Sequence, residues 1–170
     1  MIMGLGGVGM MALQFAKSMF DGPIFACDID AGKRKQGLKA GALECFDPGD
    51  KDARRAFYKM TGGAQAAVDF VGAETSLDFA QSCLTKGGRV VVAGLIGGEF
   101  KIPIPMFPLR AISIIGTFVG SLAEAHEMIA LVQSGAISPI PIETRPLDQA
   151  SATLDDLRAG KITGRVVLQP

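Results

Sequence analysis

The sequence predicts an α/β fold in which six parallel strands form a doubly wound sheet, followed by a C-terminal segment of different character. Two observations lead to this prediction. Apolar strand-like runs alternate with helix-like stretches over most of the chain, which is typical of a parallel sheet covered on both faces. In addition, the run Gly-Leu-Gly-Gly-Val-Gly at residues 4–9 stands between the first strand and a helix-like stretch, and the second strand ends on Asp28.

The first half of the chain contains three strand-helix pairs. Apolar runs predict strands at residues 1–3, 24–28 and 43–46, and helical patterns predict helices at 10–20, 31–40 and 50–60. Asp30 is the expected N-cap of the second helix, because its carboxylate can accept from free helix N–H groups. Gly41 is the expected stop, since glycine tolerates a left-handed backbone.

The second half completes the sheet and then changes character. Strands are predicted at 66–71, 89–93 and 112–116, with a helix at 75–84. Three prolines between residues 102 and 108 argue against a regular interior strand or helix there. Helices at 121–134 and 147–158 and a strand at 165–168 do not extend the alternation. We therefore divide the chain into residues 1–120 and 121–170.

Three glycines of the run at 4–9 have separate expected structural roles. Gly4 permits a sharp turn, Gly6 lets bare backbone approach a pyrophosphate, and Gly9 lets the helix pack against the sheet. The helix beginning near Gly7 directs free N–H groups and the positive end of its dipole at an anion. Asp28 follows about 20 residues later, where a carboxylate reaches an adenosine ribose. This spacing indicates a dinucleotide site; the alternative is a glycine turn without a ligand.

Composition argues against several other classes of function. The chain has 170 residues, enough for one main core, and its 17 basic and 17 acidic residues give a formal net charge of zero. No basic run indicates a nucleic-acid partner, and no apolar stretch reaches the roughly 18 residues of a membrane span. The N-terminus lacks the basic region of a signal peptide, so we expect a cytoplasmic protein.

Side chains suited to catalysis or metal binding are scarce. Cys27, Cys45 and Cys83 contain no Cys-x-x-Cys pair, so we expect buried thiols rather than a disulfide framework or a zinc site. His126 is the only histidine, and the sequence offers it no partner for a ligand set or a triad. We interpret it as a surface residue, and we assign no catalytic residue and no metal ligand to this chain.

Six segments in order along the chain carry a further pattern. They are Gly-Leu-Gly-Gly-Val-Gly at 4–9, Asp-Ile-Asp-Ala-Gly-Lys at 28–33, Gly-Ala at 41–42, Val-Asp-Phe-Val-Gly at 68–72, Gly-Gly-Arg-Val-Val-Val-Ala-Gly at 87–94 and Gly-Lys-Ile-Thr-Gly-Arg-Val-Val-Leu at 160–168. Together they resemble the medium-chain dehydrogenase/reductases, specifically the coenzyme-binding half of zinc-type alcohol dehydrogenases. The resemblance implies a Rossmann fold and hydride transfer between an alcohol or polyol and NAD.

On the adenosine side of NAD, the resemblance implies roles for eight residues. The pyrophosphate loop would be the backbone of Gly4, Leu5, Gly6, Gly7 and Val8. Asp28 would accept from the ribose hydroxyls, Lys33 would lie beside that ribose, and Arg165 would approach the pyrophosphate from the other side. The charge of Asp28 would also repel a 2′-phosphate, which favours NAD over NADP. The alternatives are a helix cap for Asp28, a solvated end for Lys33 and a surface ion pair for Arg165.

Five further residues are implied around the adenine and the nicotinamide. Val71 resembles a wall of the adenine slot and Leu95 a contact near the nicotinamide, although both could equally be plain core residues. Backbone at Ala93, Thr117 and Val119 resembles the part of the family fold that faces the carboxamide.

The resemblance also implies what this chain lacks. In the family, the zinc ligands and the start of the proton relay precede the glycine motif, so zinc is expected only in a catalytic lobe missing here, to which residues 121–170 would return. We expect a fragment of a longer protein that binds NAD weakly and oxidises no alcohol by itself. The family pairs subunits through the sixth strand, which implies a homodimer through Ile112 to Ile115.

Other readings of the sequence remain open. One is a zinc-free quinone or enoyl reductase domain that uses NADPH, against which Asp28 speaks. Another is a non-catalytic dinucleotide-binding or dimerisation module. A methyltransferase also combines glycines with an acidic residue after the second strand, but the double glycine before Val8 and the Gly164-Arg165 pair resemble the dehydrogenases more closely.

Overall fold

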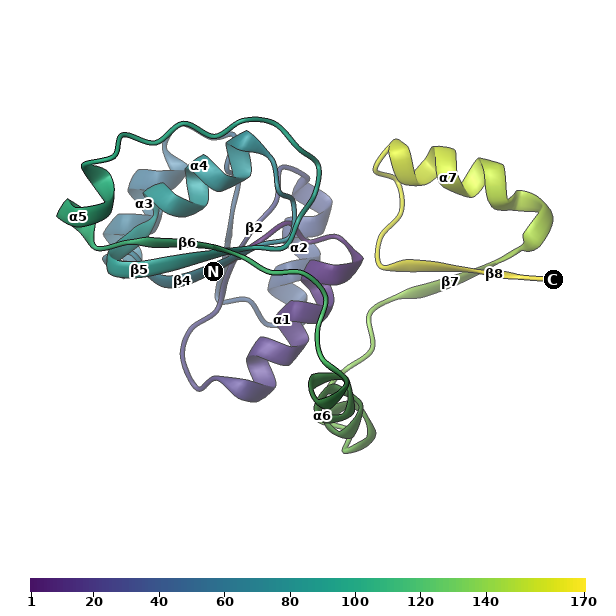
Figure 1. Cartoon of the computed structure of the whole chain (residues 1–170). Coiled ribbons are helices and arrows are strands. Elements are labelled where there is room, and N and C mark those ends of the chain that lie inside the picture. Colours follow the sequence, from purple (N-terminus) through teal and green to yellow (C-terminus); the bar gives the residue numbers. More distant parts are fainter.

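Six parallel strands form one sheet in the computed structural model, which describes residues 1–170 (Figure 1). The strands are β1 (Ile2–Met3), β2 (Phe25–Cys27), β3 (Glu44–Phe46), β4 (Ala64–Asp69), β5 (Leu84–Val92) and β6 (Ser113–Gly116). Their order is β3-β2-β1-β4-β5-β6, and every neighbouring pair is parallel. This is the order of a dinucleotide-binding doubly wound sheet. The predicted fold class is confirmed.

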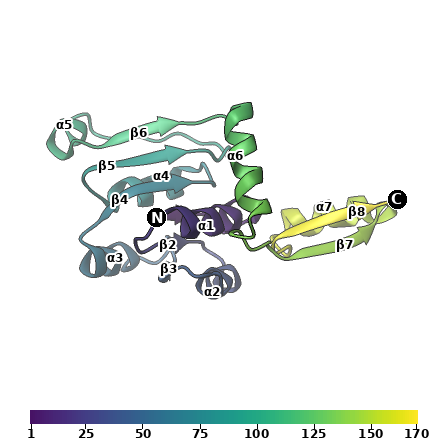
Figure 2. The same ribbon diagram turned by 90° about the horizontal axis from the view of Figure 1, so that it is seen from below.

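Helices cover both faces of the sheet. They are α1 (Gly7–Met19), α2 (Ala31–Ala40), α3 (Ala53–Thr61), α4 (Glu74–Ser82) and the short α5 (Met106–Arg110). Figures 1 and 2 show α1 and α2 on one face and α3 and α4 on the other. Parallel strands need such crossover helices, which hide both faces from water.

Two separate apolar cores follow from this layering. In β1, Ile2 packs with α1 in one core, while its neighbour Met3 packs with α3 and α4 in the other. The alternation arises because successive strand side chains point to opposite faces of a sheet. The α3 side is anchored by three aromatic rings, in which Phe57 meets Phe25 and Phe46 edge to face with centroids 5.4 Å apart.

The helix ends follow the local sequence closely. The carboxylate of Asp30 accepts from the main-chain N–H of Lys33 at 2.7 Å, and Gly41 ends α2 with a left-handed φ of 105°. Ser121 and Glu124 form a reciprocal capping box at the start of α6 (Leu122–Gln133). Such caps depend on only a few neighbouring residues, which is why the sequence predicts those at Asp30 and Gly41.

Two elements differ from the sequence expectation. Residues 102–108 were expected to contain no regular helix, yet α5 begins at Met106 and includes Pro108. Pro108 is tolerated because it lies in the first turn, where main-chain N–H groups have no helical partner to lose. In addition, β5 begins at Leu84 rather than Arg89, with a register irregularity between Ala64 and Ala66 of β4.

The C-terminal part forms a small second unit beside the sheet (Figures 1 and 2). It contains β7 (Ile142–Pro146), the single 3-10 turn η1 (Leu147–Gln149), α7 (Ala150–Arg158) and β8 (Arg165–Gln169). The strand β7 was not predicted; it pairs in parallel with β8. Arg145 of β7 ties this unit together, because its guanidinium binds Glu143 at 2.7 Å and Asp156 of α7 at 3.0 Å.

The connection between the two units is anchored on the sheet domain. Ile140 is buried among Leu5, Met10 and Leu13 of the α1-side core. The carbonyl of Pro141 accepts from the main-chain N–H of Arg165 at 3.0 Å, which brings the start of β8 back to the same place. No helix of the chain combines the length and the apolar character needed to cross a membrane.

Candidate functional site

The candidate site lies at the carboxyl ends of the strands, where the sheet changes its direction of winding. The connections from β1 and from β4, neighbours in the sheet, leave toward α1 on one face and α4 on the other. Such a switch point leaves a crevice outside the strand ends, which is where doubly wound sheets bind ligands. The loop from β1 to α1 contains the glycine run and forms one side of this crevice.

Packing within the chain accounts for two of the motif glycines but not for the third. Gly4 has a φ of +84°, and a side chain at Gly9 would overlap the carbonyl oxygen of Gly4. Gly6 has an ordinary φ of −69°, and a Cβ added there would meet no atom within 4 Å. The chain itself therefore has no need of glycine at position 6. A ligand that approaches the backbone there would supply the reason.

The start of α1 offers free donors next to that open space. Gly6 is the N-cap and provides no side-chain cap, and the first main-chain N–H to bond back to it belongs to Met10. The N–H groups of Gly7, Val8 and Gly9 therefore lack intrahelical partners. Together with the helix dipole, they make this end of α1 suited to a phosphate group.

Asp28 stands directly after β2 with its carboxylate fixed toward the glycine loop. Its Oδ2 accepts from the main-chain N–H of Leu5 at 2.7 Å, and its Oδ1 accepts from that of Asp30 at 2.9 Å. The N-cap of α2 is Asp30, so Asp28 is free of the capping role. Each of its oxygens keeps a second lone pair. The half-buried carboxylate can thus accept two more hydrogen bonds from a ligand.

Leu5 and Arg34 hold Asp28 in this position. The Leu5 side chain is buried in the α1-side core, so its contribution is the N–H that orients the carboxylate. The Arg34 guanidinium donates to the main-chain carbonyls of Asp28 at 2.7 Å and Ile29 at 2.8 Å, and to the carboxylate of Asp47 at 3.0 Å. Arg34 was not identified from the sequence, although its position one turn into α2 was the available signal.

Arg165, more than 150 residues away in sequence, lies against the glycine loop. A Cβ added at Gly7 would stand 2.7 Å from Nε of Arg165 and 3.0 Å from the carbonyl oxygen of Gly164. Arg165 takes part in none of the ion pairs of the structure. Lys33 is half-buried in the first turn of α2, and its side chain forms no hydrogen bond. The structure thus brings a cation and a helix N-terminus together.

The other predicted residues lie at the ends of β4, β5 and β6. Val71 is half-buried, with Cγ2 2.6 Å from where a Cβ of Gly4 would stand, whereas Leu95 is 86% exposed. Leu95 is therefore no core residue. The main-chain N–H of Ala93 donates to the carbonyl of Asp69 at 2.9 Å, and the main-chain N–H of Thr117 donates to the carbonyl of Val92 at 3.1 Å. Of the main-chain polar groups at these two positions, only the carbonyl oxygens remain for a ligand.

Val119 differs from Ala93 and Thr117. Its main-chain N–H makes no hydrogen bond, its φ is +49°, and the residue is 82% exposed. The strand ends therefore offer two free carbonyl oxygens and one free N–H. That set matches the two donors and the one acceptor of a primary amide.

Comparison with known proteins identifies the family. Residues 7–134 match the protein family described as zinc-binding dehydrogenase. The chain belongs to this family. The resemblance to the coenzyme-binding domain of medium-chain dehydrogenase/reductases is thereby confirmed.

Three relatives illustrate the match. The chain is 29% identical over 167 residues to an NAD-dependent alcohol dehydrogenase of Sulfurisphaera tokodaii, covering 97% of this chain and 48% of that protein. The alcohol dehydrogenase of Aeropyrum pernix superposes with a TM-score of 0.91 at 29% identity, covering 99% and 49% of the two chains. The acetophenone reductase of Geotrichum candidum in complex with NAD gives a TM-score of 0.86 at 28% identity, covering 99% and 47%. The chain thus spans about half the length of the relatives it matches.

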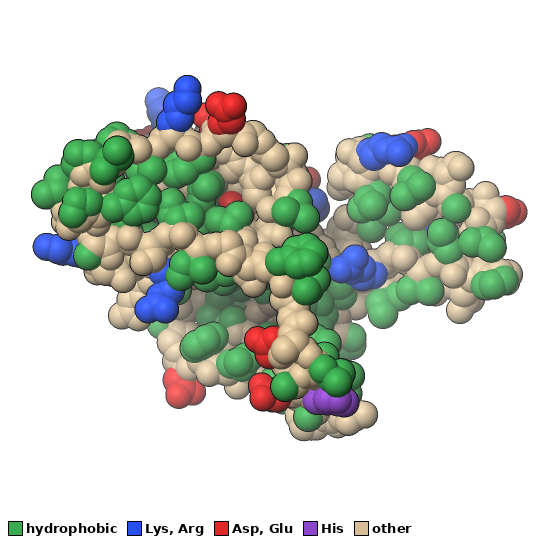
Figure 3. Space-filling model, in the orientation of Figure 1, with side chains coloured by type: hydrophobic (Ala, Val, Ile, Leu, Met, Phe, Trp, Pro, Cys, Tyr) green, Lys and Arg blue, Asp and Glu red, His purple; other side chains and the backbone are tan.

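Residues that would hold zinc do not come together in this zinc-binding dehydrogenase chain. No group of three His, Cys, Asp or Glu side chains is placed to bind a metal ion. His126 is exposed on α6, where Figure 3 shows it at the surface. The residues present do not fit a zinc site, and we derive no chemistry from zinc.

The three thiols are expected to be unreactive at neutral pH. Burial raises the pKa of Cys27 and raises the pKa values of Cys45 and Cys83 to about 11 each. Very little thiolate therefore exists at neutral pH, and the thiolate is the nucleophilic form. None of the cysteines is disulfide-bonded.

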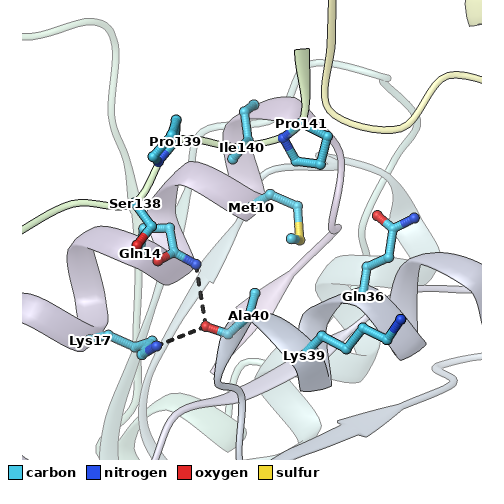
Figure 4. Close-up of a pocket in the computed structure, with 10 residues that line it drawn as sticks. All are labelled: Met10, Gln14, Lys17, Gln36, Lys39, Ala40, Ser138, Pro139, Ile140 and Pro141. Carbon is cyan, nitrogen blue, oxygen red and sulfur yellow. Dashed lines mark hydrogen bonds between the residues drawn. The ribbon is translucent and has the colours of Figure 1, made fainter. Parts of the chain in front are cut away.

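One cavity lies away from this site. It has a volume of about 350 Å³ and is lined by Met10, Gln14, Lys17, Gln36, Lys39, Ala40 and residues 138–141 (Figure 4). Gln14 and Lys17 both donate to the carbonyl of Ala40, at 3.3 and 3.0 Å, and so cap the end of α2. No acidic, histidine or cysteine side chain lines it. We therefore place the function at the glycine loop rather than in this cavity.

Proposed function

We propose that this chain is the NAD-binding portion of a zinc-dependent alcohol or polyol dehydrogenase. The observation that carries the proposal is the pairing of an open space over Gly6 with a carboxylate, Asp28, that is hydrogen-bonded to the same loop. An NAD-dependent alcohol dehydrogenase among the relatives supports it.

The adenosine side of NAD would be held by the glycine loop and its surroundings. The pyrophosphate would lie over Gly6 and accept from the N–H groups of Gly7 and Val8, with Arg165 beside it. Charge-assisted hydrogen bonds of this kind are the strong ones, and the low dielectric near the helix end strengthens them. Asp28 would accept from the ribose hydroxyls, and Lys33 would lie next to that ribose.

The nicotinamide side would be held by the strand ends. The carbonyls of Ala93 and Thr117 would accept from the carboxamide NH₂, and the N–H of Val119 would donate to its oxygen. Val71 would line the adenine slot, while the exposed side chain of Leu95 would pack against the nicotinamide ring. Burying Leu95 in this way removes apolar surface from water, worth roughly 25 cal/mol for each Å² covered.

Bound NAD would supply the hydride acceptor, and this chain's residues would bind and orient it. Hydride transfer also needs a group that stabilises the developing alkoxide and a route for its proton. We propose that a catalytic lobe provides both, and that residues 1–120 form the NAD-binding domain while residues 121–170 belong with that lobe. The 170-residue chain alone is then expected to bind NAD weakly and to oxidise no alcohol.

The exposed surface supports a larger assembly. The chain exposes 10522 Å², whereas a compact protein of this mass exposes about 8,000 Å². Figure 3 shows apolar side chains gathered around α5 and the loop before it. Ile104 of that loop and Leu109 of α5 are 81% and 70% exposed. Contiguous exposed apolar surface of this kind marks contact sites.

We also propose a homodimer through Ile112 to Ile115. The strand β6 pairs only with β5, so its other edge is open, and Ile115 is 44% exposed. An open apolar edge invites pairing with a second strand. Sedimentation velocity at increasing concentration tests this: Ile115→Lys should shift the chain toward monomer. An NAD-induced change in association without alcohol oxidation in any longer form would favour the non-catalytic module instead.

A cytoplasmic location completes the proposal. All three cysteines are free thiols, which is typical of reducing compartments. Fractionation of cells that express the chain, with thiol labelling before and after reduction, tests it. Oxidised cysteines in the native protein would contradict it.

The decisive experiment for NAD is a calorimetric comparison of NAD and NADP. Wild type should prefer NAD by about tenfold or more, because Asp28 repels the 2′-phosphate. Asp28→Asn should reduce this preference. Asp30→Asn is the matched control, since asparagine caps α2 as well as aspartate and the NAD preference should remain. Tighter binding of NADP by wild type would favour the quinone or enoyl reductase alternative. Binding of neither would remove the proposal.

A further inference from the structure

A buried carboxylate outside the predicted NAD contacts connects the two sides of the site. Asp69, the last residue of β4, is fully buried and forms no ion pair. Its Oδ1 accepts from the main-chain N–H groups of Val71 at 2.9 Å and Gly72 at 3.1 Å, and its Oδ2 accepts from the hydroxyl of Ser76 at 2.8 Å. Burying a carboxylate is costly unless donors surround it. Here neutral donors do so, and they belong to the turn after β4 and to the first turn of α4.

The main chain of the same residue holds the neighbouring strand end. The carbonyl oxygen of Asp69 accepts from the N–H groups of both Ala93 and Gly94, each at 2.9 Å. These residues follow β5 directly. Asp69 thus bonds through its side chain to the exit of β4 and through its carbonyl to the exit of β5.

The two exits touch each other backbone to backbone. A Cβ at Gly72 would overlap the carbonyl of Gly94, and a Cβ at Gly94 would overlap the main chain of Val71. Beyond this contact, Ile96 donates to the carbonyl of Val71 at 3.2 Å, and Gly97 donates to that of Gly72 at 2.9 Å. A displacement of the Val71-Gly72 turn must therefore also displace the segment that contains Ala93 and Leu95.

We propose that Asp69 is a positioning residue that sets both sides of the NAD site at once. It would place Val71 for the adenosine side and Ala93 to Leu95 for the nicotinamide side, without contacting NAD itself. This inference rests on the proposed function, because the two sides are defined by the bound dinucleotide. Asp69 stands in an apolar strand run, where an unpaired acidic residue was the signal in the sequence.

Three variants of this hydrogen-bond group make the inference testable. Asp69→Ala removes both acceptor oxygens and with them all three side-chain hydrogen bonds, and Ser76→Ala removes only the donor to Oδ2. In Asp69→Asn, the amide oxygen can still accept from Val71 and Gly72, while the amide NH₂ can donate to Ser76. The Ser76 hydroxyl can then donate to the carbonyl of Ala73, which it already approaches at 2.9 Å. Asparagine should therefore rescue what alanine loses.

The test is calorimetric titration of the 170-residue chain with NAD and with ADP-ribose, well below the unfolding temperature. ADP-ribose probes the adenosine side alone, and the ratio of the two affinities reports the nicotinamide side. Asp69→Ala should weaken ADP-ribose about tenfold and should also lower the NAD to ADP-ribose ratio. Asp69→Asn should stay within about threefold of wild type. Asp78 lies on α4, like Ser76, and forms an exposed ion pair with Arg54 of α3. Asp78→Ala is therefore the control and should change neither value.

Ser76→Ala keeps the inference testable if Asp69→Ala does not fold. It should weaken ADP-ribose and accelerate amide hydrogen exchange at Val71 and Gly72, while Val68 in the body of β4 keeps its wild-type rate. Folded Asp69→Ala or Ser76→Ala that binds both ligands like wild type would overturn the inference. Failure of wild type to bind either ligand would instead overturn the proposed function.

Discussion

Replacing Gly6 with alanine should separate ligand binding from folding. A Cβ at position 6 meets no atom within 4 Å, and φ is −69°, so the folded chain can accept it. Alanine is a poorer N-cap than glycine by roughly 0.5–1 kcal/mol, but it restricts the unfolded chain, which gains about 0.4–1 kcal/mol. The two effects nearly cancel. We expect the free energy of unfolding to change by less than about 1 kcal/mol.

The same methyl group should strongly weaken NAD binding. It would occupy the space next to the free N–H groups of α1, where the pyrophosphate is proposed to lie. One or two charge-assisted hydrogen bonds would be lost, at about 1.5–3 kcal/mol each. A total loss of about 2–4 kcal/mol corresponds to an increase in Kd of about 30- to 1,000-fold.

Denaturant unfolding and calorimetric titration with NAD measure the two effects on one sample. Gly22→Ala is the matched control, because a Cβ there also meets nothing within 4 Å and the position lies between α1 and β2, away from the loop. Gly9→Ala should behave in the opposite way and unfold the chain, since its Cβ would overlap the carbonyl of Gly4. A folded Gly6→Ala chain that binds NAD as tightly as wild type would refute the reasoning.

Three further predictions concern stability and reactivity. Because burial raises the pKa of Cys27, the folded chain keeps the thiol proton of this residue, whereas the unfolded chain loses it above about pH 9. The free energy of unfolding should therefore fall by about 1 kcal/mol for this group by pH 10. In urea unfolding, Cys27→Ala should lose less stability than wild type as the pH is raised. Cys45 is half-buried, whereas Cys27 and Cys83 are buried, so Cys45 should be the one cysteine of the folded chain that reacts with a thiol reagent at pH 7.5. The reaction should be slow, because its pKa is raised to about 11. All three cysteines should react in urea, and rapid labelling of Cys27 in native protein would contradict this. The hydrogen bond from Arg145 lowers the pKa of Asp156, so this ion pair is present at neutral pH and is lost as pH falls below about 4. Arg145→Met should speed amide hydrogen exchange in β7 at pH 7 and leave NAD affinity unchanged. Equal exchange rates in wild type and variant at pH 7 would count against the ion pair.

Features that depend on neighbouring residues could be predicted from the sequence. The cap at Asp30, the stop at Gly41 and the separate tasks of Gly4 and Gly9 all follow from residue type and short spacing, and the structure has them. The parallel sheet covered on both faces likewise follows from the alternation of strands and helices along the chain.

Features that depend on distant partners could not be predicted. The strand β7 ends in Pro146 and carries exposed polar residues, and only its pairing with β8, some 20 residues later, makes it a strand. Arg145 shows its role only once α7 folds back over it. Asp69 lies in a segment that the sequence singles out, yet its bonds to Ala93 and Gly94 exist only because β4 and β5 are neighbours.

A crystal structure of this chain soaked in millimolar NAD tests the central claim most directly. We predict density for the pyrophosphate over Gly6 at the start of α1, with the adenosine ribose hydroxyls on the carboxylate of Asp28. No nucleotide in well-folded crystals with an open glycine loop, or a nucleotide in the cavity between α1 and α2 instead, would contradict the account.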